Sequence, residues 1–227
     1  MDTPFRVSFW GVRGSYPMPG ADTARVGGNT ACVEVEAGGQ LIIFDAGTGI
    51  IKLGQSLNQR SQDAQRPLQA SLFFTHVHHD HTQGFPFFFP ARSARHEVYI
   101  FGPRTLHEDL EEALSKAMLP PVFPLALEDF SAIRQVRNIQ EGETVLMGGE
   151  LKEPQVLNVF RDDLQLGQHT ARVSVLKSYA HPKGGVFIYR VDAGGKPPPG
   201  AKSAATARRW ARISSLLSRN RNVSMTQ

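Results

Sequence analysis

The sequence predicts a β-rich α/β domain, and three observations lead to this expectation. Many short segments either alternate between apolar and polar residues or are continuously apolar, as β-strands are. Only two segments in the first 192 residues have apolar side chains at helical spacing. The chain of 227 residues is 41% hydrophobic and 20% charged, which is typical of a folded domain with a sizeable core.

The first half of the chain should begin with a strand and a Gly/Pro-rich loop that continues through Gly28. A hairpin follows, in which the turn AGGQ joins residues 31–36 to the buried strand 41–44. The next segment, 49–58, has apolar residues along one side and predicts a short helix. After a polar loop, residues 70–74 form an apolar strand that ends directly in a group of histidines.

The second half predicts one more helix and several strands. The helix covers about residues 104–117, with acidic residues early and Lys116 late, as the helix dipole favours. Strands are expected over the whole chain at 5–10, 31–36, 41–44, 70–74, 97–101, 131–137, 143–147, 154–160, 171–177 and 185–191. The phenylalanine-rich segment 85–90 can pack in the core, line a substrate pocket or form a homodimer surface.

The net charge of +4 comes from the last 35 residues alone. Residues 193–227 contain seven Lys or Arg and no acidic residue, which leaves 18 basic against 21 acidic residues before them. We therefore divide the chain into a domain at 1–192 and a basic tail at 193–227. A short amphipathic helix around Trp210 is one interpretation of the tail, and a poorly ordered extension is the one we favour. Because the basic charge lies outside the domain, the net charge is poor evidence for a nucleic-acid partner. Such a partner stays open.

Several classes of protein are not expected. No run approaches 18 apolar residues, so we expect no membrane span. The first residues lack the layout of a secretion signal, and the single cysteine, Cys32, excludes an internal disulfide. We therefore expect a cytoplasmic protein.

The strongest chemical signal is the segment Thr75–His81, which holds four of the eight histidines. So many imidazoles at the end of a buried strand are costly to bury unless they bind a metal. His76 and His78 are two residues apart and can face one ion, while Asp80 and His81 can face a second. Zinc accepts both donor types, and two ions about 3.5–4 Å apart can activate water and stabilise a phosphoryl or acyl centre. The alternative is a surface loop that binds metal adventitiously.

This segment, HVHHDH, resembles the HxHxDH motif of the metallo-β-lactamase-fold hydrolases. The segments FWGVRGSYP at 9–17, GGNT at 27–30, IIFDAGTGI at 42–50 and the Ala180-His181-Pro182 step resemble the same superfamily. Together they are most similar to its phosphodiesterase-like branch, which includes ribonuclease Z and cyclic phosphodiesterases, although thioesterases such as glyoxalase II share HxHxDH. The resemblance covers about residues 5–192. It implies an αβ/βα four-layer sandwich and zinc-dependent hydrolysis of small-molecule or nucleotide phosphodiesters by a metal-bound hydroxide.

The resemblance also implies roles for single residues. His76, His78 and His181 would hold the first zinc, and Asp80 and His81 would contribute to the second. Asp80 would also orient the bridging water and accept its proton. Asp45 would fix a ligand imidazole from behind.

Two of these assignments have alternatives from the residues alone. Asp45 is as well placed to cap the helix at 49–58. His181 stands before a proline, where a turn residue is common. For His181 we favour the role of ligand because of the earlier histidines.

The resemblance stops near residues 191–196, where the next strand of the family should begin. The family continues with a Tyr-x-x-Asp segment and a further histidine, whereas no Asp, Glu or His follows Asp192. Asp162 and Asp163 look like turn residues rather than substitutes. We expect an incomplete C-terminal part, from a shifted reading frame or a truncated gene, and an unpaired strand near 185–191. We therefore expect the chain to bind one or two zinc ions. The alternative to a hydrolase is a non-catalytic metal-binding protein.

Overall fold

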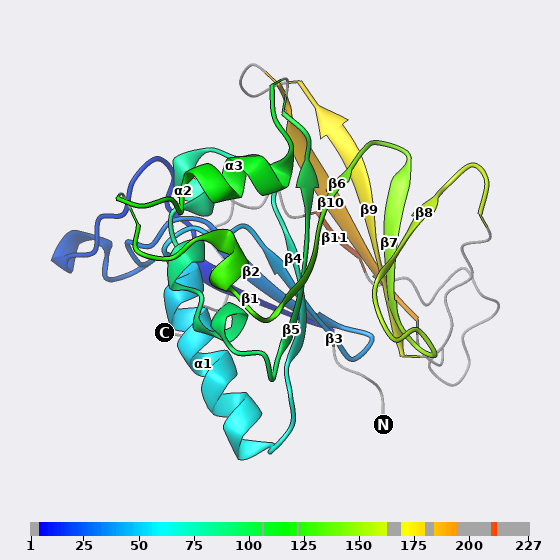
Figure 1. The fold of residues 1–227 in the computed structure, drawn as a ribbon, viewed down its shortest axis with the longest axis horizontal. Coiled ribbons are helices and arrows are strands. Elements are labelled where there is room, and N and C mark those ends of the chain that lie inside the picture. Colours follow the sequence, from blue (N-terminus) through cyan, green and yellow to red (C-terminus); the bar gives the residue numbers. More distant parts are fainter. Residues whose placement is uncertain are drawn as a thin grey trace.

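The computed structural model describes residues 5–105, 107–121, 123–162, 169–179, 184–194 and 210–212. Its elements form two facing β-sheets, with helices on the outer side of the first sheet (Figure 1). The strands between residues 6 and 139 build the first sheet, and those from residue 143 onward build the second.

The first sheet has six strands in the order β1-β2-β3-β4-β5-β6. Strands β1 to β3 are antiparallel, and β3 to β6 are parallel. Parallel neighbours need crossover connections, and the helix α1 provides the one between β3 and β4. The strands are β1 Arg6–Gly11, β2 Cys32–Ala37, β3 Gln40–Phe44, β4 Gln69–Phe73, β5 Glu97–Pro103 and β6 Ile133–Ile139.

The second sheet is antiparallel in the order β11-β10-β9-β7-β8. Its strands are β7 Glu143–Gly148, β8 Gln155–Asn158, β9 Thr170–Ser178, β10 Val186–Ala193 and β11 Trp210–Arg212. Strand β11 pairs with Arg190, Val191 and Asp192 of β10. The edge that we expected to be unpaired near 185–191 therefore has a partner over its last residues, while the rest of the tail lies outside the described residues.

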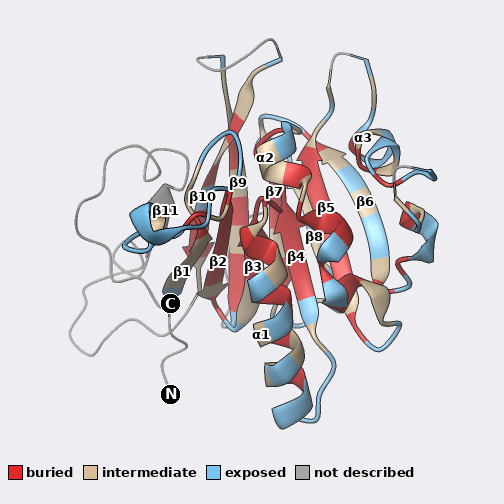
Figure 2. Ribbon diagram, turned by 90° about the vertical axis from the view of Figure 1, so that its left-hand side faces the viewer, coloured by how far each residue is buried: buried red, intermediate tan, exposed pale blue. Residues whose placement is uncertain are grey.

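The main core lies between the two sheets. Phe44, Phe73 and Phe101 of the first sheet meet Tyr189 of β10 in a cluster of buried rings whose contacting centroids are 5.0–5.6 Å apart. A second apolar cluster lies between the first sheet and its helices, so β3, β4 and β5 are buried on both faces (Figure 2). Such continuous apolar strands are typical of parallel sheets covered on both sides.

The helices are α1 Gly49–Asp63, α2 His79–Thr82 and α3 Leu110–Lys116, with short 3₁₀ turns at Ala21–Thr23, Phe85–Phe87, Phe89–Arg92 and Leu127–Asp129. Helix α1 runs five residues beyond the predicted end, and α3 begins six residues later than predicted. The later start has a local reason: the Oγ1 atom of Thr105 accepts the backbone N–H of Glu108 and closes a turn before the helix. Of the phenylalanine-rich segment, Phe85 and Phe88 pack in the core, while Phe87 and Phe89 are half exposed.

The two facing sheets, with helices outside the first, agree with the sandwich that the resemblance implies. Three of its four expected layers lie in the described part of the chain: helices, first sheet and second sheet. Within that part no helix covers the outer face of the second sheet (Figure 1). None of the described helices is long and apolar enough to cross a membrane.

Candidate metal centre

The histidine cluster lies at the carboxyl end of β4, where the chain leaves the buried centre of the first sheet. Thr75 and His76 are still buried, and the chain then turns into the single-turn helix α2, which contains Asp80 and His81. His78 precedes this helix in an extended conformation, which turns the chain between the two pairs of candidate ligands. Loops at the carboxyl ends of parallel strands are the usual place for functional side chains in such sheets.

Asp45 connects this turn to the neighbouring strand β3. Its buried carboxylate accepts hydrogen bonds from the backbone N–H of Thr75 at 2.8 Å and from its hydroxyl at 3.0 Å. The other oxygen, Oδ2, is 2.8 Å from Nδ1 of His81. The backbone of Asp45 has φ 61°, a left-handed conformation that Asp tolerates better than most residues. The N-cap of α1 is Thr48, so the interpretation of Asp45 as the cap of that helix is wrong.

The three imidazole rings of His76, His78 and His81 are close together. The ring centroid of His76 is 4.6 Å from that of His78 and 4.1 Å from that of His81. The hydroxyl of Thr75 is 3.0 Å from Nδ1 of His76. In both His76 and His81 the Nδ1 atom therefore faces a protein group, the Thr75 hydroxyl or the Asp45 carboxylate. Such a contact sets the tautomer and the orientation of an imidazole that binds metal through Nε2.

Asp80 completes the group and is held by a loop that is distant in sequence. Its Oδ2 atom accepts the backbone N–H of Ser15 at 2.8 Å and is 3.5 Å from Nε2 of His81. Two ligand atoms at ~2.0–2.1 Å from a tetrahedral zinc ion are about 3.4 Å apart. The Asp80–His81 pair therefore has the spacing of two ligands on one ion.

Ser15 is itself unusual, because it has φ 73° and is not glycine. Such a conformation costs free energy and persists only where the surroundings hold it. Here it directs the N–H of Ser15 at the Asp80 carboxylate. Ser15 lies inside the FWGVRGSYP segment, but no sequence pattern marks it as a contact of Asp80.

The charges at the centre favour a cation. Burial works against a charge on His81, but the adjacent carboxylates of Asp45 and Asp80 outweigh it and raise the pKa of this imidazole. Burial also opposes the charge of Asp80, but the N–H of Ser15 and the ring of His81 outweigh it and lower the pKa of the carboxyl group. Two carboxylates next to clustered imidazoles form a donor set that suits a divalent metal ion.

Strand β10 of the second sheet forms hydrogen bonds to the two residues that follow β4. The hydroxyl of Tyr189 donates to the carbonyl of Phe74 at 2.6 Å, and the N–H of Phe187 donates to the carbonyl of Thr75 at 2.9 Å. The two residues immediately before His76 are therefore fixed by both sheets.

Close backbone packing holds helix α2 against the loop after β3. A Cβ atom on Gly47 would lie 2.4 Å from the carbonyl oxygen of Asp80, and one on Gly84 would lie 2.1 Å from the carbonyl oxygen of Gly47. The N–H of Ala46 also donates to the carbonyl of His81 at 2.7 Å. Only glycine allows backbones to approach this closely. The packing against α2 therefore explains why the segment IIFDAGTGI has a glycine at position 47.

Not every expected residue can be placed. His181 and Asp163 lie outside the described residues, and Asp162 accepts the N–H of Asn158 as a turn residue does. Within the described part of the chain, no group of three or more His, Cys, Asp or Glu side chains is arranged to hold one metal ion. The structure brings Asp45, His76, His78, Asp80 and His81 close to one another, and their roles at a metal ion, like that of His181, stay predictions.

Comparison with known proteins gives one informative sequence match. Ribonuclease Z of Pyrococcus horikoshii is 25% identical over 128 residues, which cover 55% of this chain and 38% of that protein. The chain thus matches less than half the length of this curated relative. No family model matches.

Two solved structures are similar at low identity. A diphosphatase of the PhnP family has 12% identity and a TM-score of 0.48, over 82% of this chain and 62% of that one. A mutant metallo-β-lactamase of Cronobacter sakazakii has 12% identity and a TM-score of 0.38, over 73% of this chain and 54% of that one. The chain is therefore similar to ribonuclease Z over about half of its own length, and its two-sheet fold and histidine segment agree with that likeness.

Proposed function

We propose that the protein is a metal-dependent hydrolase of phosphodiester bonds, with zinc as its metal. The observation that supports this most is the spacing of 3.5 Å between Asp80 Oδ2 and His81 Nε2, with the far nitrogen of His81 held by buried Asp45. A ligand imidazole backed by a carboxylate is the common arrangement around zinc in proteins.

Each residue of the centre then has a role. His76 and His78, with His181, would hold a first ion, and Asp80 and His81 would contribute to a second. Such ions, when bound, lower the pKa of water toward ~7 and stabilise negative charge on a phosphoryl group. Asp45 fixes the ring of His81 and the backbone of Thr75, so that the ligand atoms stay in place.

Asp80 would also accept the proton of the attacking water. It is suited to this because the N–H of Ser15 holds one of its oxygens and keeps the carboxylate oriented. Burial opposes the charge of Asp80, but the N–H of Ser15 and the ring of His81 outweigh it and lower the pKa, which stabilises the carboxylate form that a metal ligand needs.

The choice of a phosphodiester substrate, from a small molecule or a nucleotide, rests on the likeness to ribonuclease Z. A thioesterase would use the same ligands and is the alternative substrate class. A cytoplasmic location, a homodimer and a nucleic-acid partner also remain proposals. The last of these predicts binding that weakens steeply with salt and is lost when residues 197–227 are removed.

The test is turnover of bis(p-nitrophenyl) phosphate by the full chain, with metal content measured on the same preparations. His78→Ala should abolish turnover and lower bound zinc. His79→Ala is the matched control, because His79 is an exposed neighbour without an assigned role, and it should keep both. Equal turnover in the two variants, or hydrolysis of a thioester but not of the phosphodiester, would contradict the proposal.

A second candidate is a non-catalytic protein that keeps a single metal ion. The specific observation in its favour is that residues 193–227 contain no Asp, Glu or His, so this chain offers the second ion few donors. Metal content separates the two candidates. About two zinc ions per chain support the hydrolase, while one ion without turnover supports the second candidate.

A further inference from the structure

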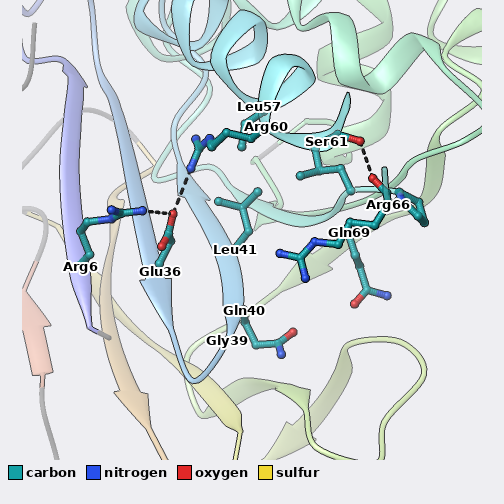
Figure 3. Close-up of a pocket in the computed structure, with 12 residues that line it drawn as sticks. Arg6, Glu36, Gly39, Gln40, Leu41, Leu57, Arg60, Ser61, Arg66 and Gln69 are labelled. Atoms are coloured by element: carbon teal, nitrogen blue, oxygen red, sulfur yellow. Dashed lines mark hydrogen bonds and ion pairs between the residues drawn. The ribbon is translucent and has the colours of Figure 1, made fainter. Parts of the chain in front are cut away.

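A pocket of about 460 Å³ opens at the other end of the first sheet, away from the histidines. Its walls come from the beginning of β3 and β4, from the end of α1, and from the edge strand β1 and its neighbour β2 (Figure 3). Gln69 lines it, and His76 lies seven residues further along the chain, which is about 20 Å at the rise of a β-strand. The pocket is thus separate from the candidate metal centre.

Three guanidinium groups, of Arg6, Arg60 and Arg66, line the pocket with a single carboxylate, Glu36. Arg6 and Arg60 both contact Oε1 of Glu36, at 2.6 and 3.0 Å, and Arg60 is also 2.7 Å from the buried carboxylate of Glu34. Three cations therefore meet two carboxylates, which leaves one positive charge in excess.

The excess charge belongs to Arg66. Among the described residues its guanidinium makes no hydrogen bond or ion pair, and the backbone carbonyl of Arg66 is fixed by the hydroxyl of Ser61. Figure 3 shows the Arg66 side chain extending across the pocket toward Leu41. An arginine placed in this way presents its planar donors to whatever enters the pocket.

The pocket also has an apolar side, formed by Leu41, Leu57, Pro67 and Leu68. Its volume lies in the range of small-molecule sites, which combine an apolar lining with a few polar groups that fix orientation. The ligand that fits has an anionic group for the arginines and an apolar or planar body for the leucines.

We propose that this pocket is a non-catalytic binding site for a small phosphate monoester with an apolar or planar body. A phosphate monoester offers three acceptor oxygens, which can take the planar donors of Arg66 together with further N–H groups of Arg6 and Arg60 that their ion pairs with Glu36 and Glu34 leave over, whereas a carboxylate offers only two oxygens. The site is independent of hydrolysis at the metal centre.

The test uses adenosine 5′-monophosphate as the probe and isothermal titration calorimetry of the full chain. The wild type should bind this nucleotide at least about tenfold more tightly than adenosine or inorganic phosphate, because only the nucleotide has both parts. Arg66→Gln should weaken binding by about tenfold or more, as expected for the loss of a charged hydrogen-bond donor.

Two control variants locate the binding. Arg137→Gln removes an exposed arginine of β6, away from the pocket, and should leave affinity within about twofold. His78→Ala should also leave it unchanged. The proposal is overturned if the wild type does not bind the nucleotide, if Arg66→Gln binds like the wild type, or if His78→Ala is the variant that loses binding.

Discussion

Removing the hydroxyl group of Tyr189 tests how the second sheet holds the strand end that carries the histidines. The ring of Tyr189 is buried between the sheets, and its hydroxyl donates to the carbonyl of Phe74 at 2.6 Å. Burial, and then the charge of Asp45, raise the pKa of this hydroxyl well above 10, so it is a donor at every pH where the protein is studied. Tyr189→Phe keeps the ring and deletes only this donor.

The size of the effect follows from what is left behind. The variant loses one hydrogen bond and leaves a buried carbonyl oxygen without its donor, which costs about 1–3 kcal/mol. For a domain of this length, 1 kcal/mol corresponds to about 2–4 °C in melting temperature. A loss of about 2 kcal/mol therefore predicts a fall of about 6 °C.

Urea denaturation and thermal unfolding of the full chain measure this change. Tyr179→Phe is the matched control, because it removes the same hydroxyl from a side chain that is 78% exposed, and it should change stability by less than about 0.5 kcal/mol. Equal stability of the two variants would refute the assignment of the Tyr189–Phe74 hydrogen bond as a connection between the sheets.

Three further predictions concern buried polar groups. Asp192→Ala should lower the free energy of unfolding, measured by urea denaturation, by about 3–5 kcal/mol. The reason is that the mostly buried Arg172 loses the carboxylate that lies 2.9 Å from its guanidinium. A loss below about 1 kcal/mol would contradict this. Burial, and then a neighbouring arginine, lower the pKa of His96 below 6.5, so the stabilisation it provides is complete above pH 6.5 and is lost as the pH falls. The free energy of unfolding of the wild type should therefore drop more between pH 7.5 and pH 5 than that of His96→Asn, and equal slopes would disprove the assignment. Asp45→Asn should weaken zinc binding in calorimetry by about 10–100-fold, because the carboxylate at 2.8 Å orients His81; unchanged affinity would remove Asp45 from the site.

The order of strands and helices was predictable because its signals are local. Each strand from β1 to β10 has its own apolar or alternating pattern, and the predicted bounds agree with the structure within a few residues. The start of α3 was not predictable in this way, because the turn at Thr105 depends on a side-chain hydrogen bond to Glu108. Hydrophobic periodicity does not report such a bond.

In the candidate site, too, the residues that are neighbours in sequence were predictable, and the contacts between distant residues were not. The segment Thr75–His81 was recognisable because its donors are neighbours in sequence and follow a buried strand. The contact between Ser15 and Asp80 was not, since the two residues are 65 positions apart and meet only through a left-handed backbone conformation at Ser15. The two interpretations of Asp45 were also equal in sequence; the structure rejects the helix cap, because the N-cap of α1 is Thr48, and places the Asp45 carboxylate 2.8 Å from His81.

The sequence by itself thus determined the α/β class and the position of the candidate metal ligands, because periodicity and short motifs are properties of neighbouring residues. The tertiary structure alone decided which distant groups support that centre and where the chain forms the basic pocket. Arg6, Arg60 and Arg66 have no pattern in common along the chain. They meet because the pairing of β1, β2 and β3, together with the end of α1, brings three separate segments to one end of the sheet.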